Sequence, residues 1–162
     1  YGGLRFPIEA RMDGRRFVRV SVDLAAGDCW IQPHQTIETH NWLGFAGIPP
    51  ATVPVISLEQ QFAEKLHSYT QPRDKENSRV KDLVDMVLII RENSMSINTL
   101  KEIAEATFAK RKGSIWPPEF EDPPPTWARR FKPMAEMCGI TDSIEAAVEE
   151  VRAWCRLAGI VK

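Results

Sequence analysis

The feature that most constrains the fold of this 162-residue chain is an alternating pattern near its N-terminal end. Apolar and polar residues alternate up to Met12, the pair Asp13-Gly14 follows, and a second alternating run extends to Leu24. A period of two places the apolar side chains on one face of a strand, and Asp-Gly tolerates the positive φ angles of a tight turn. The sequence therefore predicts a β-hairpin with one buried face, and Pro7 places its first strand at a sheet edge. The apolar positions are Phe6, Ile8, Ala10, Met12, Val18, Val20, Val22 and Leu24.

Residues 25–54 form a long connection that is rich in glycine and proline. A connection of this length without structure of its own is unusual and is often functional. We expect Trp30 and Trp42 to hold it against the core. The segment TVPVI, residues 52–56, is expected to close it as a short strand.

The remainder of the chain carries apolar residues at helical spacing and predicts five helices. Ser57-x-x-Gln60 resembles a capping box at the start of the first helix, and Thr99-x-x-Glu102 resembles one at the start of the third. Pro133 lies within the fourth and is expected to kink it. The predicted fold is therefore α+β, a small sheet followed by a helical bundle, with one domain at 1–56 and a helical domain at 57–162.

Bulk properties exclude several classes of protein. The net charge of −1 argues against nucleic-acid binding driven by the overall charge of the chain. Any function that needs basic side chains must therefore come from their local arrangement. Three widely separated cysteines fit a reducing, cytoplasmic setting better than a disulfide framework. Neither the cysteines nor the three histidines have the spacing of a zinc site. No apolar run approaches the roughly 20 residues of a membrane helix, so no membrane partner is expected.

Residues 63–85, AEKLHSYTQPRDKENSRVKDLVD, carry ten formal charges, five of each sign. Arg79 and Asp82 are three residues apart, and Lys81 and Asp85 are four apart, so each pair can meet on a helix surface. The turn before this helix is expected to fold it back and bring Lys65 toward the same face.

Two interpretations of this charged stretch stay open on chemistry alone. An exposed face with ion pairs worth about 0.3–0.5 kcal/mol each is the simpler one. Alternatively, the basic side chains hold phosphates while the carboxylates orient them. Nucleotidyl transfer needs that arrangement because its transition state spreads negative charge over several oxygens. Two interpretations are also open for Asp23. A lone strand carboxylate is usually solvated, whereas one that lies beside other carboxylates can hold a divalent metal.

The order of these motifs resembles the AbiEii-type nucleotidyltransferases, members of the polymerase-β-like superfamily that include toxins of type IV toxin–antitoxin systems. The segments that carry the resemblance are VSVDLAAGD, VISLEQQFAEKLHSYT and NSRVKDLVDMVLI. The downstream FAKRKG, the PPP-T-W run and the amphipathic last helix are similar to the family's C-terminal helical region. On this resemblance, the hairpin is a remnant of the family's mixed sheet and the chain is its C-terminal portion.

The resemblance also implies roles for individual residues. Asp23 resembles the third metal-binding carboxylate of the superfamily, and Lys65 matches the lysine expected to meet the nucleotide's phosphates. The family's R-x-K-D motif falls on Arg79, Lys81 and Asp82, and Asp85 follows on the same face. The implied catalytic residues are Lys65, Lys81 and Asp82, the implied nucleotide-binding residues are Lys65, Arg79, Lys81 and Asp85, and the implied metal ligand is Asp23.

The implied activity is transfer of a nucleotide from a nucleoside triphosphate to a hydroxyl acceptor with Mg²⁺. Transfer RNA or another RNA is a plausible acceptor, and an antitoxin is an implied protein partner in abortive infection. The superfamily's first signature, G-S followed by a spaced D-x-D, has no match in this chain. We therefore expect a truncated fragment that is inactive by itself.

Two other functions are compatible with the sequence. One is a non-catalytic helical module that binds an antitoxin or another protein through its Pro-rich turn and exposed Trp116 and Trp127. Packing of both tryptophans between helices is the simpler expectation. The other is a protein that binds nucleotides without transferring them.

Overall fold

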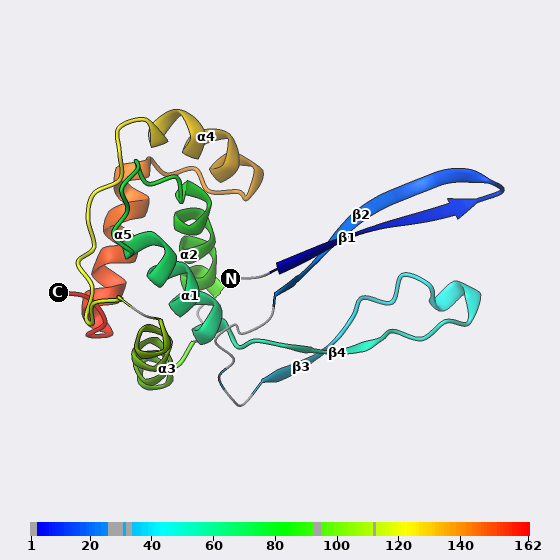
Figure 1. Ribbon diagram of the computed structural model, residues 1–162, viewed down its shortest axis with the longest axis horizontal. Coiled ribbons are helices and arrows are strands. Elements are labelled where there is room, and N and C mark those ends of the chain that lie inside the picture. Colours follow the sequence, from blue (N-terminus) through cyan, green and yellow to red (C-terminus); the bar gives the residue numbers. More distant parts are fainter. Residues whose placement is uncertain (1–2, 26–30, 32–33, 93–94, 112) are drawn as a thin grey trace. The chain divides into compact units, whose positions relative to one another are not determined.

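Strands come first along the chain and helices follow, so the predicted α+β fold is confirmed (Figure 1). The computed structural model describes residues 3–25, 31, 34–92, 95–111 and 113–162. The chain divides into two compact units, Tyr1–Trp30 and Ile31–Lys162. The predicted helical domain, residues 57–162, lies wholly within the second unit.

The first unit is the predicted hairpin. Strands β1, Gly3–Met12, and β2, Arg15–Ala25, pair in antiparallel fashion around a turn in which Asp13 has φ 50° and Gly14 has φ 70°. Both strands are exposed along their whole length. The prediction of a buried face is therefore wrong for this structure, because a two-stranded ribbon has no second layer of its own to cover its apolar side. That side is formed by the cross-strand pairs Leu4–Leu24, Phe6–Val22, Ile8–Val20 and Ala10–Val18.

The connection after the first hairpin has structure of its own. Strands β3, Gln35–Glu38, and β4, Thr52–Val55, form a second antiparallel hairpin, and a single 3₁₀ turn, η1, Gly44–Ala46, lies between them. The predicted short strand is thereby confirmed. Trp42 is 74% exposed and its nearest aromatic neighbour is His40, with ring centroids 4.4 Å apart. The prediction that Trp42 anchors the connection to the core is wrong, and Trp30 lies outside the described residues.

Five α-helices complete the described part of the second unit. The two capping predictions have different outcomes. Ser57 Oγ accepts a hydrogen bond from the Gln60 amide, as predicted, whereas the third helix is capped by Ser96 and begins before Thr99. Pro133 lies inside the fourth helix, as predicted. The helices are α1, Leu58–Thr70; α2, Val80–Glu92; α3, Ile97–Lys110; α4, Trp127–Met137; and α5, Ile144–Leu157.

The apolar core lies between these helices. Helix α1 packs against α2 and α3, and α2 packs in turn against α4 and α5. Trp127 is fully buried in this core, and its indole N–H donates to the Asn77 carbonyl at 2.6 Å. Trp116 is partly buried against Phe108, with ring centroids 5.1 Å apart. The exposed tryptophan surface required by the interaction-module hypothesis is therefore absent, since both rings pack among the helices.

Two of the three cysteines lie in the part of the chain that the structure describes. Cys138 and Cys155 are both free thiols, and Cys29 lies outside the described residues. Among the helices that the structure describes, none combines the length and the apolar character needed to cross a bilayer.

Candidate functional site

Helices α1 and α2 bring together four of the six predicted site residues. Lys65 Nζ donates a hydrogen bond to Asp85 Oδ2 at 2.6 Å and lies 3.4 Å from Asp82 Oδ1. Arg79 Nε lies 3.9 Å from Asp82 Oδ2. The prediction that the turn folds the second helix back onto the Lys65 side of the first is thereby confirmed. We refer to Lys65, Arg79, Asp82 and Asp85 as the Lys65 cluster.

The turn that makes this approach possible depends on Asn77. Its side-chain amide donates to the Tyr69 carbonyl at 2.8 Å, and its side-chain oxygen accepts from the Arg79 amide at 3.0 Å. Its own carbonyl accepts from Trp127. One residue therefore joins the end of α1, the start of α2 and the start of α4. Sequence reasoning assigned Asn77 no role, although an asparagine just ahead of a helix is a typical capping and turn residue.

The Lys65 cluster is partly withdrawn from water. The side chain of Lys65 is 31% exposed, that of Asp85 is 24% exposed, and that of Asp82 is only 10% exposed. Burial by itself lowers the pKa of Lys65, but the hydrogen bond and negative charge of Asp85, together with the charge of Asp82, outweigh burial. The net result is a raised pKa for Lys65. Lys65 therefore stays a cation at neutral pH.

Two groups in the cluster keep unused bonding capacity. An ammonium group has three N–H donors, and Asp85 and Asp82 engage at most two of those of Lys65. Asp82 Oδ2 is buried and accepts no hydrogen bond within the part of the chain that the structure describes. Its 3.9 Å separation from Arg79 Nε is too long for one. The cluster can therefore bind a further oxygen at the partly exposed Lys65, whereas the free valence of Asp82 Oδ2 is closed to solvent.

Lys81 lies on α2 but outside the cluster. Its side chain is exposed, and within residues 34–92, 95–111 and 113–162 it forms no ion pair. The expected contact between Lys81 and Asp85 is absent because Asp85 pairs with Lys65 instead. Lys81 is a solvated cation on the helix that carries Asp82 and Asp85.

Asp23, the implied metal ligand, belongs to the first unit. Arg5 donates to both of its carboxylate oxygens, from Nε at 2.5 Å and from Nη2 at 2.7 Å. The hydrogen bond from Arg5 lowers the pKa of Asp23. Among the described residues, no group of three or more histidine, cysteine, aspartate or glutamate side chains is placed to hold a metal ion. The residues that the structure describes do not by themselves supply a set of ligands for a divalent metal ion.

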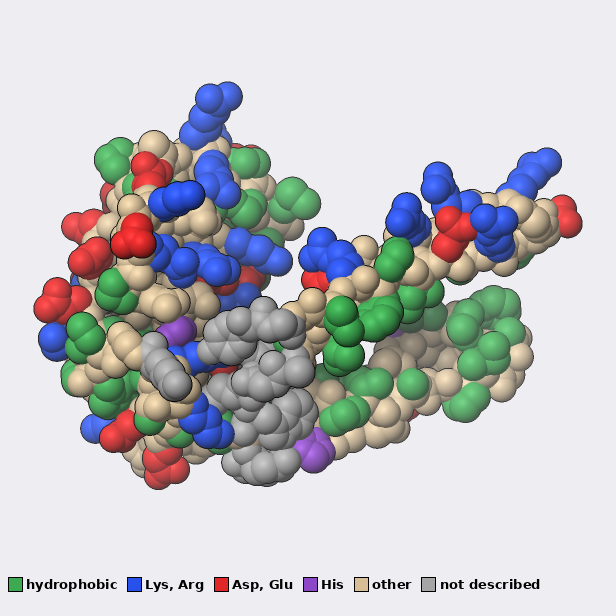
Figure 2. All heavy atoms as spheres, in the orientation of Figure 1, with side chains coloured by type: hydrophobic (Ala, Val, Ile, Leu, Met, Phe, Trp, Pro, Cys, Tyr) green, Lys and Arg blue, Asp and Glu red, His purple; other side chains and the backbone are tan. Residues whose placement is uncertain are grey.

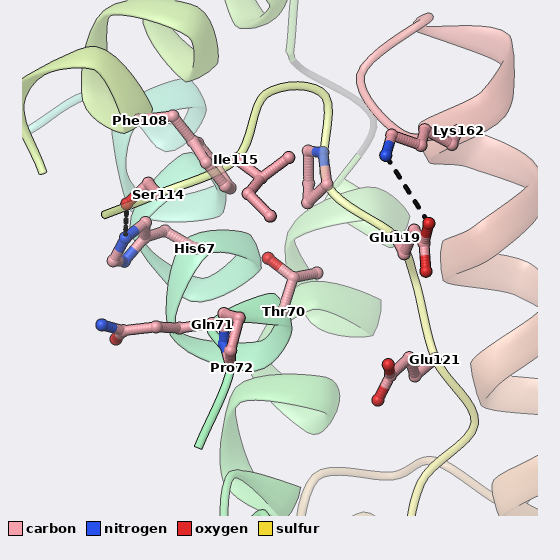
Figure 3. Close-up of a pocket in the computed structure, with 11 residues that line it drawn as sticks. His67, Thr70, Gln71, Pro72, Phe108, Ser114, Ile115, Glu119, Glu121 and Lys162 are labelled. Atoms are coloured by element: carbon pink, nitrogen blue, oxygen red, sulfur yellow. Dashed lines mark hydrogen bonds and ion pairs between the residues drawn. The ribbon is translucent and has the colours of Figure 1, made fainter. Parts of the chain in front are cut away.

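A small pocket of about 160 Å³ lies beside α1, near His67 (Figure 3). His67 Nε2 is 2.8 Å from Ser114 Oγ, and Lys162 pairs with Glu119 at 3.5 Å across the pocket wall. Burial, with the positive charges of Arg111 and Arg73, lowers the pKa of His67. His67 is two residues from Lys65, so the two side chains leave the helix on different faces. The pocket therefore contains none of the predicted site residues.

The comparison with protein families agrees with the sequence resemblance. The family described as "Nucleotidyl transferase AbiEii toxin, Type IV TA system" matches residues 1–154. The matched region includes the first compact unit, the second unit up to residue 154, and all six predicted site residues. A search of curated proteins finds no match to the chain.

Proposed function

The chain belongs to the AbiEii nucleotidyl transferase toxin family, and from this premise we propose that the Lys65 cluster and Lys81 bind the phosphates of a nucleoside triphosphate during nucleotidyl transfer. Membership of this type IV toxin–antitoxin family implies a nucleotide substrate and an antitoxin partner. The observation that carries the proposal is the position of the Lys65 ammonium group, held between Asp85 and Asp82 with a donor to spare.

The roles of the individual residues follow from charge. In the proposed reaction a hydroxyl acceptor attacks the α-phosphate and pyrophosphate leaves, so negative charge must be stabilised on several oxygens. Lys65 and Arg79 donate to these oxygens, while Asp85 and Asp82 keep the Lys65 ammonium in place. The two cations and two carboxylates of the cluster cancel, so the exposed Lys81 supplies the excess positive charge that attracts a triphosphate.

The acceptor and the metal are finer parts of the proposal. We expect the acceptor to be an RNA, such as a transfer RNA, as the family resemblance implies. The family suggests a divalent metal, for which Mg²⁺ is our expectation. Because the G-S and D-x-D signature has no match in the sequence, we expect the 162-residue chain alone to transfer no nucleotide.

Nucleotide binding tests the proposal without requiring transfer. Each of the four common ribonucleoside triphosphates is titrated into the purified chain and into Lys65→Ala and Lys81→Ala variants. Charge-assisted hydrogen bonds are worth about 1.5–3 kcal/mol, so Lys65→Ala should weaken binding about tenfold or more. Lys81→Ala should weaken it less, because an exposed cation acts through a screened field.

The control is Lys101→Ala, which removes an exposed lysine from α3 and should leave affinity unchanged. A Lys65→Arg variant retains the positive charge and should keep part of the affinity, which distinguishes loss of a phosphate contact from loss of structure. Unchanged affinity in both Lys65→Ala and Lys81→Ala would remove the phosphate role from this face.

A further inference from the structure

The outer end of the first hairpin is strongly basic. Residues 11–19, RMDGRRFVR, contain four arginines and a single acidic residue, in a chain whose net charge is −1. Figure 2 shows basic side chains along this hairpin as far as its turn. All four arginines are exposed. The charge is therefore concentrated locally, in the way that binding of a polyanion requires when the whole chain carries almost none.

The partners of these arginines are unevenly distributed. Arg11 Nε donates to Glu9 Oε1 at 2.6 Å. Arg15, Arg16 and Arg19 form no ion pair within residues 3–25 or elsewhere in the described part of the chain. Glu9 faces Arg19 across the ribbon but is engaged by Arg11 instead.

The register also places like charges together. Arg11 and Arg16 are directly opposite each other on the two strands. Like charges in this position oppose strand pairing; Glu9 offsets the charge of Arg11, and a bound anion would offset that of Arg16. A pairing of this kind is easier to explain as a place for an anion than as a contribution to hairpin stability.

An exposed aromatic ring lies between the arginines. Ala10 pairs with Val18, whereas Arg11 pairs with Arg16, so Phe17 is the extra residue of a β-bulge. A bulge leaves one residue without a cross-strand partner and re-aims its side chain. The Phe17 side chain is 71% exposed, with Arg16 before it and Arg19 two residues after it. An exposed ring flanked by cations is the combination that binds unpaired nucleotides, through base stacking and phosphate contacts.

We propose that the outer end of the β1–β2 hairpin, with Arg11, Arg15, Arg16, Arg19 and Phe17, binds a single-stranded segment of RNA. The arginines contact the phosphodiester backbone, and a base stacks on Phe17. This inference rests on the proposed function for the identity of the partner as the RNA acceptor. It concerns residues that are separate from the Lys65 cluster and that have no role in the nucleotide-binding proposal.

The test is equilibrium binding of a short, labelled, single-stranded RNA of mixed sequence to the 162-residue chain, without nucleotide or metal. The test variant carries Arg15→Gln, Arg16→Gln and Arg19→Gln together. Its matched control carries Arg129→Gln, Arg130→Gln and Lys132→Gln, which removes the same charge from exposed positions on α4. We expect about a tenfold or greater loss of affinity in the hairpin variant and little change in the control.

Salt dependence and the aromatic ring give two independent readouts. Each phosphate contact contributes about 0.7 to the slope of log K against log salt for a single strand, so the hairpin variant should lose about 2 from that slope. Phe17→Ala should weaken binding about tenfold without changing the slope, because stacking is uncharged. Binding to an RNA duplex should be weaker than to the single strand, since paired bases cannot stack on the ring.

Several results would overturn the inference. Equal losses in the hairpin and α4 variants would show a response to total charge alone. Full affinity in the hairpin variant, or binding to anionic phospholipid vesicles in place of RNA, would exclude this surface as an RNA site. Triphosphate binding by the hairpin variant is measured alongside. Loss of RNA binding with intact triphosphate binding supports the inference. If the Lys65 variants bind triphosphates as tightly as wild type, the phosphate role of the Lys65 cluster is lost, but the RNA-binding result for the hairpin stands.

Discussion

Two aspartates singled out by the family pattern meet a cation in very different surroundings. On the first hairpin, Asp23 pairs with Arg5 through two hydrogen bonds, yet the two side chains are 62% and 71% exposed. Between α1 and α2, Lys65 is 31% exposed and Asp82 only 10%. Water screens the attraction between Arg5 and Asp23 strongly, and it screens the attraction between Lys65 and Asp82 much less. The comparison teaches that good hydrogen-bond geometry alone does not make a fixed site; partial removal from water is also required.

The same contrast holds for the apolar residues that support each pair. Phe62 and Leu83, on α1 and α2, are fully buried in the core of the helical region. On the hairpin, Phe6 and Val22 face each other but remain 47% and 46% exposed. Four predictions follow the contrast from its largest expected effect to its smallest.

The largest effect is expected from truncating a matched phenylalanine in each region. Phe62→Ala removes a fully buried ring and should lower the free energy of unfolding by about 3–5 kcal/mol. Phe6→Ala removes a half-exposed ring and should cost about 1 kcal/mol or less. Urea denaturation measures both, followed by the helical circular dichroism signal for Phe62→Ala and by the strand signal for Phe6→Ala. Equal costs would mean that the hairpin face is covered in solution.

Removing Lys65 should have the next largest effect. Lys65→Met leaves two partly buried carboxylates without their cation and should lower the free energy of unfolding by about 1–3 kcal/mol at neutral pH. Because folding raises the pKa of Lys65 above its ordinary value of 10.5, this stabilisation is complete below pH 10.5. It is lost as the pH rises through the raised value, so the difference from wild type should shrink in strongly alkaline solution.

Lys81→Met is the control for that experiment. Lys81 lies on the same helix as Asp82 and Asp85, is exposed, and has no ion pair among the described residues. Its replacement should change the free energy of unfolding by about 0.5 kcal/mol or less. A loss in Lys81→Met as large as that in Lys65→Met would show that the cluster contributes no more than an exposed charge.

His67 gives a smaller, pH-dependent test within the helical region. Its pKa is lowered in the folded protein by burial and by the charges of Arg111 and Arg73. The unfolded chain therefore takes up a proton first as the pH falls below the ordinary value of 6.5, and stability should decline until the lowered value is passed. In His67→Gln this decline should be smaller. Identical pH profiles from urea midpoints at pH 7 and below would contradict the assignment.

The smallest effect is expected at the exposed pair. Asp23→Asn breaks the ion pair with Arg5 but alters no buried group. Exposed ion pairs contribute little to stability, so the urea midpoint should stay at its wild-type value. Triphosphate binding should be unchanged as well, since Asp23 is outside the Lys65 cluster. A destabilisation comparable to that of Lys65→Met would remove the contrast between the two regions.

Local patterns predicted the elements more reliably than their surroundings. The Asp13-Gly14 turn, the cap at Ser57 and the short strand near Thr52 all follow from rules that operate over a few residues, and the structure contains each of them. The third helix was predicted to start too late, because Ser96 and Thr99 are both acceptable caps and the sequence pattern does not choose between them.

Expectations that depended on distant neighbours were less successful. Lys81 and Asp85 have ideal spacing for a helix-surface pair, yet Asp85 bonds Lys65 from another helix. Trp42 has the size and apolarity of an anchor, but it lies on the exposed connection between β3 and β4. For Asp85 the partner was decided by the helix that packs nearby, and Trp42 is exposed because no described element packs over it.

The sequence by itself determined that strands precede helices and that the apolar residues of the first hairpin share one face. It also determined the family and the residues from which a phosphate site could be assembled. Only the tertiary structure decided which of those residues work together. Asn77 turns the chain so that α2 lies against α1, and the buried faces of these helices fix the distance from Lys65 to Asp82 and Asp85. The physical reason is that spacing along one helix limits which side chains share a face, whereas burial and partners come from elements distant in the chain.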